Sequence, residues 1–156
     1  MQAVTNPLIH QPQFNLPVLK EGDGGDAVRE LQQLLMQRYC YVAAVDGIFA
    51  VATTSAVKAF QNRVFLPTTG IVDDRTWRAI YKDAPVDMPV LLPGSQGEII
   101  MIVQQKLRRT RDYNAAIDGN FGSQTTAAVK AFQTRLGLSA DGIVNDKTWC
   151  YLSKII

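Results

Sequence analysis

The chain has 156 residues, and its 16 Lys and Arg against 14 Asp and Glu leave a net charge of +2. A charge this close to zero argues against a nucleic-acid-binding protein, and no apolar run approaches the roughly 18 residues that a membrane span needs. The only histidine is His10, which excludes sites built on several imidazoles, so we expect no metal ion. We also expect no other cofactor.

Residues 1–16 form a predicted leader that is rich in Pro, Gln and Asn. They lack the basic start and the apolar stretch of a secretory signal, so the sequence does not reveal an export route. His10 lies in this leader, where we do not expect a rigidly held catalytic base.

The rest of the chain is an internal duplication. The hexapeptide Ala-Val-Lys-Ala-Phe-Gln occurs at 56–61 and again at 128–133, and the same offset of 72 residues aligns 17–81 with 89–153 without a gap. Two copies of one small unit account for the length better than a single domain does. We therefore predict one module at 17–81 and a second at 89–156, joined by a short linker at 82–88 that contains Pro85.

Three helices are predicted in each copy. In the first two helices, apolar residues at i, i+3 and i+7 form one buried stripe. These residues are Val28, Leu31 and Leu35, then Val57, Phe60 and Val64, in the first copy, and Ile100, Val103 and Leu107, then Val129, Phe132 and Leu136, in the second. Asp73 and Asn145 are suited to cap a short third helix, and Ser123 is predicted to cap the second helix of its copy, where the first copy has Val51.

Turn dipeptides connect these helices. Asp46-Gly47 and Asp118-Gly119 are typical of turns, and we interpret both aspartates as turn-forming residues, with ligand contact as the alternative. The aromatic residues at core spacing are predicted to be buried, and a buried tryptophan needs a partner for its indole N–H. They are Phe49, Phe60, Trp77, Phe121, Phe132 and Trp149.

Together these motifs resemble the tandem peptidoglycan-binding domain family, whose pattern combines Val-x-x-Leu-Gln, Asp-Gly-x-Phe-Gly, Ala-Val-x-x-Phe-Gln and Thr-Trp. The second copy carries the later part of this pattern from Asp118 to Trp149, and the first copy has the better first helix, from Val28 to Leu35. The resemblance implies an all-α fold of two tandem three-helix modules joined by a short linker. It also implies a location at the bacterial cell wall, in the periplasm or outside the cell.

Two residues of the first copy depart from the pattern. Ala50 stands where the family has Gly, and Thr69 stands where the second copy has Asp141. An alanine resists a positive φ by about 1 kcal/mol or more. If Ala50 needs such a φ, we expect the first copy to be the weaker binder.

Candidate ligand contacts are polar or aromatic residues near the loops. Tyr41 and Tyr113 precede the Asp-Gly turns, Arg63 and Arg135 end the second helices, and Asn120 follows Gly119. An aromatic face, an arginine and hydrogen-bonding side chains suit sugars, acetamides and peptide carboxylates. The alternative is surface packing for the tyrosines and helix-end charge for the arginines.

The resemblance implies a non-catalytic protein that binds peptidoglycan, through its glycan or its stem peptides, and gains avidity from two modules. The alternative is an adaptor that uses the same fold to dock a protein partner, such as a cell-wall enzyme or part of a secretion or phage-like machine. Catalysis is not expected, because the chain has only three Glu and no nucleophile with an evident base. Cys40 and Cys150 fall at non-equivalent places in the repeat, which predicts free thiols.

Overall fold

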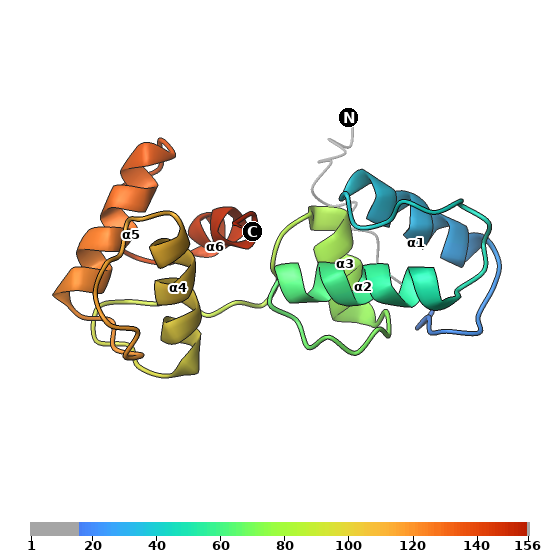
Figure 1. Cartoon of the computed structure of the whole chain (residues 1–156), viewed down its shortest axis with the longest axis horizontal. Helices are drawn as coiled ribbons and strands as arrows, with labels where there is room; N and C mark the ends of the chain where they lie inside the picture. Colours follow the sequence, from blue (N-terminus) through green and yellow to red (C-terminus); the bar gives the residue numbers. More distant parts are fainter. Residues whose placement is uncertain (1–15, 156) are drawn as a thin grey trace, which may run out of the picture. The chain divides into compact units, whose positions relative to one another are not determined.

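The computed structural model describes residues 16–155, so the predicted leader, apart from Leu16, lies outside the described residues. These residues form six α-helices and no β-strand, and they divide into two compact units between Asp83 and Ala84 (Figure 1). We call residues 16–83 module 1 and residues 84–155 module 2. Module 1 holds α1 (Asp26–Gln37), α2 (Val51–Arg63) and α3 (Asp74–Lys82), and module 2 holds α4 (Glu98–Arg109), α5 (Ser123–Arg135) and α6 (Asp146–Ser153). The predicted all-α fold of two three-helix modules is confirmed.

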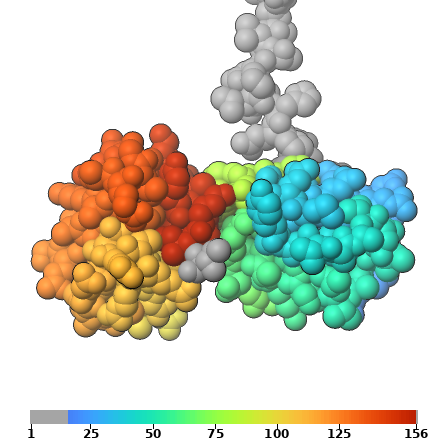
Figure 2. Space-filling model, turned by 45° about the horizontal axis from the view of Figure 1, so that its top comes forward, coloured from blue at the N-terminus to red at the C-terminus, as the bar shows by residue number. Residues whose placement is uncertain are grey.

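The first helix of each module packs on the other two. In module 1, the side chains of α1, in blue to cyan, meet those of α2, in green, on the face that Figure 2 shows. The stripe residues and all six aromatic residues predicted for the core are buried, with the exception of the half-buried Leu136. The sequence pattern therefore identified the core because it depends on spacing within each helix.

In each module, one tryptophan of the last helix forms a hydrogen bond to the extended segment that precedes the first helix. The indole Nε1 of Trp77 donates to the carbonyl of Pro17 at 2.9 Å, and that of Trp149 donates to the carbonyl of Pro89 at 2.8 Å. Leu19 pairs with Val72, and Leu91 with Val144, in isolated antiparallel bridges beside these contacts. Each buried indole thus has the partner that the sequence required.

The predicted caps of the third helices are confirmed, but the prediction that Ser123 caps the second helix of module 2 is wrong. Asp73 Oδ1 accepts a hydrogen bond from the Thr76 amide at 2.9 Å, and Asn145 Oδ1 accepts one from the Thr148 amide at 3.1 Å. Ser123 is instead the first residue of α5, and Gly122 is the cap, without a side-chain hydrogen bond. The helix begins one residue earlier than it would if Ser123 were its cap.

Ala50 is not strained. It caps α2 with φ −107° and ψ −170°, and Gly122 has nearly the same conformation, with φ −94° and ψ −165°. This is extended backbone that any residue adopts. Ala50 therefore does not need the positive φ on which the expectation of weaker binding by the first copy depended.

Cys40 and Cys150 are free thiols, each half-buried in its own module. Among residues 16–155, no helix is both long enough and apolar enough to cross a membrane.

Candidate functional site

Each module contains two buried glutamines, and each glutamine holds one loop. In module 2, Gln104 on α4 accepts from the amide of Gly119 at 3.1 Å and donates to Asp118 Oδ1 at 2.9 Å and to the carbonyl of Asn120 at 3.1 Å. One amide side chain thereby pairs with three consecutive residues of the Asp-Gly turn. Gln32 holds the turn at 46–48 of module 1 in the same way.

Gln133 on α5 repeats this arrangement at the loop that leads into α6. Its Oε1 accepts from the amide of Gly142 at 3.0 Å, and its Nε2 donates to Asp141 Oδ1 at 3.1 Å and to the carbonyl of Ile143 at 2.9 Å. It also donates to Thr148 Oγ1 at 3.1 Å, which joins the loop to α6. Because the glutamine is buried and fully paired, the loop has a fixed position against the helix.

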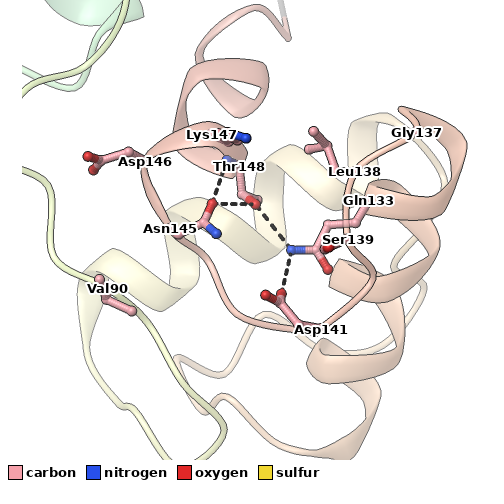
Figure 3. A pocket seen from close by; sticks show the side chains of 10 residues that line it. All are labelled: Val90, Gln133, Gly137, Leu138, Ser139, Asp141, Asn145, Asp146, Lys147 and Thr148. Atoms are coloured by element: carbon pink, nitrogen blue, oxygen red, sulfur yellow. Dashed lines mark hydrogen bonds between the residues drawn. The ribbon is translucent and has the colours of Figure 1, made fainter.

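A groove of about 700 Å³ lies in module 2 between the loop after α5 and the start of α6 (Figure 3). Its wall combines aliphatic surface, hydroxyl groups, an amide and charges of both signs. The lining residues are Val90, Gln133, Gly137, Leu138, Ser139, Asp141, Asn145, Asp146, Lys147 and Thr148. A concave surface with several converging polar groups is a candidate ligand site.

Asp141 and Asn145 each use one side-chain oxygen for the hydrogen bonds that hold the loop and the start of α6, which we call the frame of the site. Asp141 Oδ1 accepts from Gln133 and from the amide of Ile143, at 2.9 Å in the latter case. Asn145 Oδ1 accepts from the amide of Thr148 and, at 3.3 Å, from its hydroxyl. The second carboxylate oxygen of Asp141 and the Nδ2 of Asn145 take no part in these bonds (Figure 3). They offer a ligand one acceptor and one donor.

At the equivalent place, the described residues of module 1 line a small hollow. Its volume is about 70 Å³, and it is lined by Gln61, Leu66, Pro67, Thr69, Asp73, Arg75 and Thr76. Pro67 stands in place of Ser139, Thr69 in place of Asp141, and Arg75 in place of Lys147. The two modules therefore share the frame of this site but not its open space.

The tyrosines predicted as ligand contacts are buried. Tyr41 is 5% exposed and Tyr113 3% exposed. The Tyr41 hydroxyl accepts from Gln32 Nε2 at 3.2 Å and donates to the carbonyl of Ala44 at 2.7 Å, and the Tyr113 hydroxyl bonds Gln104 and Ala116 likewise. Because the buried glutamine bonds each hydroxyl, neither ring offers the exposed aromatic face on which the predicted ligand contact depends. The edge of Tyr113 still lines a second hollow, of about 590 Å³, in module 2.

The predicted arginines are held at the ends of their helices. Arg63 donates to the carbonyl of Arg38 at 3.0 Å and to the carboxylate of Asp83, and its guanidinium lies 5.1 Å from the centre of the Phe60 ring. Arg135 donates to Asp112 Oδ2 at 2.7 Å, with its side chain about half exposed. Arg135 therefore remains more accessible to a ligand than Arg63, whose side chain is 25% exposed.

Asn120 is exposed on the Asp-Gly turn and is not among the residues that line the groove. None of the five predicted contacts lines the groove. The groove residues Ser139, Asp141, Asn145 and Lys147 were not among the predicted candidates. The signal was present at position 141, where the two copies differ between Thr and Asp, but the difference does not by itself reveal a groove.

Asp46 and Asp118 are confirmed as turn-forming residues. The hydrogen bond from the Ile48 amide, followed by that from Gln32, lowers the pKa of Asp46. The hydrogen bond from Gln104, followed by that from the Asn120 amide, lowers the pKa of Asp118. Both carboxylates are charged at neutral pH and stabilise the turns as acceptors. Within the described residues, no three metal-ligating side chains lie together.

Comparison with known proteins agrees with this organisation. The family described as "Putative peptidoglycan binding domain" matches the chain twice, at residues 24–80 and 96–152. The N-acetylmuramoyl-L-alanine amidase CwlL of Bacillus licheniformis is 29% identical over 165 residues, which cover 89% of this chain and 46% of that protein. The amidase CwlM of Mycobacterium tuberculosis is 33% identical over 107 residues, which cover 65% of this chain and 26% of that protein. The chain thus spans less than half the length of these two relatives.

A solved structure, the N-terminal domain of SleB, is 33% identical to this chain with a TM-score of 0.43. The match covers 43% of this chain and 92% of that domain.

Proposed function

Because the chain belongs to the peptidoglycan-binding domain family, we propose that it is a non-catalytic protein whose two modules attach it, or a protein it serves, to the bacterial cell wall. The observation that carries this proposal is the double family match, with one copy on each three-helix module. A location at the wall, in the periplasm or outside the cell follows from the proposed ligand.

The groove of module 2 supplies surface chemistry that suits this polymer. Peptidoglycan offers sugar hydroxyls, acetamides and peptides with ionised ends. The wall of the groove offers the Asp141 carboxylate, the Asn145 amide, the Ser139 hydroxyl and the Lys147 ammonium group, beside the aliphatic Val90. Such a mixture of donors and acceptors pairs with a polar ligand without leaving buried groups unsatisfied.

We assign binding rather than catalysis to this chain, because the family matches account for both modules as binding domains. The amidase activity named for the relatives belongs to proteins more than twice as long as the stretch they share with this chain. A binding role also agrees with the site itself, where the polar side chains that line the groove are partly committed to holding the loop.

Two modules on one chain increase attachment to a polymer. Once one module is bound, a short linker gives the other an effective ligand concentration of roughly millimolar, so that apparent affinity rises by about a hundredfold or more when both reach the polymer. The modules contribute unequally in this proposal, since the groove is about 700 Å³ in module 2 and its counterpart about 70 Å³ in module 1.

Co-sedimentation of the full chain with purified insoluble peptidoglycan tests the proposal. We expect the chain to pellet with peptidoglycan in a saturable manner and to stay in solution with cellulose, an insoluble polymer without acetamides or stem peptides. A chain that stays in solution with both polymers would contradict wall binding and favour the protein-adaptor alternative. Release of soluble sugar or peptide fragments during the incubation would contradict the non-catalytic role.

A further inference from the structure

The groove of module 2 carries charge, which bears on the part of peptidoglycan that it binds. Asp141, Asp146 and Lys147 all line it and are exposed. A neutral ligand that covers such groups removes their water without replacing it by an opposite charge, which is unfavourable. The glycan strand is neutral wherever its lactyl groups are joined to peptides, whereas the stem peptides carry carboxylates and, at a diamino acid, an ammonium group. The charges therefore favour the peptide.

The apolar side chains of the groove also favour a peptide over a sugar. None of the described residues that line it is aromatic. A sugar ring is bound most readily on the flat apolar face of an aromatic side chain. The apolar part of this groove is instead formed by Val90 and Leu138, which are branched aliphatic side chains. They suit the methyl and methylene groups of a short peptide better than the face of a pyranose.

The carboxylate of Asp141 is not needed for the fold, because module 1 holds the equivalent turn with a threonine. Thr69 Oγ1 accepts from the Ile71 amide at 3.1 Å and from Gln61 Nε2 at 3.3 Å. These are the two bonds that Asp141 Oδ1 makes to Ile143 and Gln133. The hydroxyl of Thr69 thus replaces one carboxylate oxygen, and module 2 has a negative charge and a second oxygen beyond what the turn uses.

We propose that the groove of module 2 binds the stem peptide of peptidoglycan, with the second carboxylate oxygen of Asp141 accepting a hydrogen bond from the ammonium group of the peptide's diamino acid. The inference rests on the proposed function and names the ligand of the same site. The Nδ2 of Asn145 donates to a carbonyl of the peptide. The hollow of module 1, which has Thr69 in place of Asp141, does not take this ligand.

The test is a titration of the isotope-labelled full chain, followed by NMR, with three soluble probes. The first is a stem tripeptide that ends in a diamino acid with its side-chain amine free, and the second is the same tripeptide acetylated at that amine. The third is a peptide-free oligomer of the glycan strand whose lactyl groups are amidated, so that it is neutral. We expect the free-amine tripeptide to shift the backbone resonances of Gly142 and Asn145. Acetylation should weaken binding by about tenfold, since a charge-assisted hydrogen bond is lost.

The variant Asp141→Thr places the residue of module 1 in module 2 and keeps both turn hydrogen bonds, so it should fold. It should bind the free-amine tripeptide about tenfold more weakly and should no longer distinguish it from the acetylated one. Asp141→Asn is a second variant that keeps Oδ1 and removes the charge, with the same expected loss. Asp118→Thr is the matched control, because it makes the same change in the other turn of module 2, away from the groove, and should leave tripeptide binding unchanged.

The outcomes separate this inference from the proposed function. If the chain pellets with insoluble peptidoglycan but the free-amine tripeptide leaves the groove resonances unshifted, the inference fails and wall binding stands. Shifts of the same resonances by the glycan oligomer, or undiminished tripeptide binding by Asp141→Thr and Asp141→Asn, would also overturn it. If the chain neither pellets nor binds the tripeptide, both proposals fall.

Discussion

Modules 1 and 2 have the same frame and different grooves. Gln61 and Gln133 hold equivalent loops with the same pattern of hydrogen bonds, and the Trp77 and Trp149 indoles donate to equivalent prolines. The space beside those loops is nevertheless about ten times larger in module 2, where Asp141 replaces the threonine of module 1.

This difference shows which part of the repeated pattern reports on function. The Asp-Gly and Ala-Val-x-x-Phe-Gln motifs supply turn aspartates and buried glutamines that hold the loops in both modules. The residues proposed to contact the ligand lie between these motifs, in the loop after the second helix and at the start of the third. A family pattern can therefore match both modules while the open space beside their loops differs.

The largest expected effect tests whether the cores are equivalent. Trp77→Ala and Trp149→Ala each remove a fully buried side chain and its hydrogen bond. Each should lower the free energy of unfolding of its own module by about 3–5 kcal/mol. Urea unfolding followed by circular dichroism measures the loss. A nearly neutral result for one tryptophan would contradict the equivalence of the two cores.

The next effect separates the frame from the groove. Gln61→Leu and Gln133→Leu leave buried loop groups, such as the amide of Gly70 or Gly142, without a partner. Each should cost about 2–3 kcal/mol in thermal or urea unfolding. Only Gln133→Leu should also weaken retention on peptidoglycan at a temperature where both variants stay folded, because only its loop lines an open groove. Equal loss of retention in both variants would argue for two similar sites.

A smaller effect concerns the start of the second helices. Gly122→Ala should stabilise module 2 by about 0.4–1 kcal/mol, because the backbone there suits alanine and the unfolded chain loses freedom. A Cβ at Gly122 meets no atom within 4 Å. Ala50→Gly should destabilise module 1 by a similar amount. A lower melting temperature of Gly122→Ala in thermal unfolding would contradict the equivalence of positions 50 and 122.

The smallest effect is a shared dependence on pH. The pKa of Asp46 and of Asp118 is lowered in the folded state by hydrogen bonds. Their contribution to stability is therefore present above the unfolded value of about 4, and it is lost as the pH falls through the folded pKa. Asp46→Asn and Asp118→Asn keep an acceptor oxygen and should each reduce the loss of melting temperature on acidification below about pH 4. An unchanged acid profile in both variants would contradict this role.

The sequence predicted the features that depend on nearby residues. The core aromatics follow helical spacing, and the caps at Asp73 and Asn145 bond an amide three residues away. The predictions for Tyr41 and Tyr113 missed the burial because each hydroxyl meets a glutamine on the preceding helix, and such a partner is fixed by tertiary packing.

The groove could not be predicted because its volume depends on how the loop after α5 lies against α6. The exchange of Pro67 for Ser139 and of Arg75 for Lys147 is visible in the sequence, but its effect on open space is not. The sequence shows that the two copies differ at Asp141. The hydrogen bonds of Thr69 in module 1 then show that the turn does not need the charge of Asp141.

The central claim is that the chain holds peptidoglycan mainly through the groove of module 2. The most direct test is co-sedimentation of the full chain with insoluble peptidoglycan after exchanging groove residues between the modules. The double variant Ser139→Pro, Asp141→Thr should lower the apparent affinity by about tenfold or more. The reciprocal variant Pro67→Ser, Thr69→Asp in module 1 should bind at least as well as the unchanged chain. Equal retention of all three proteins, or a loss confined to the module 1 variant, would contradict the account.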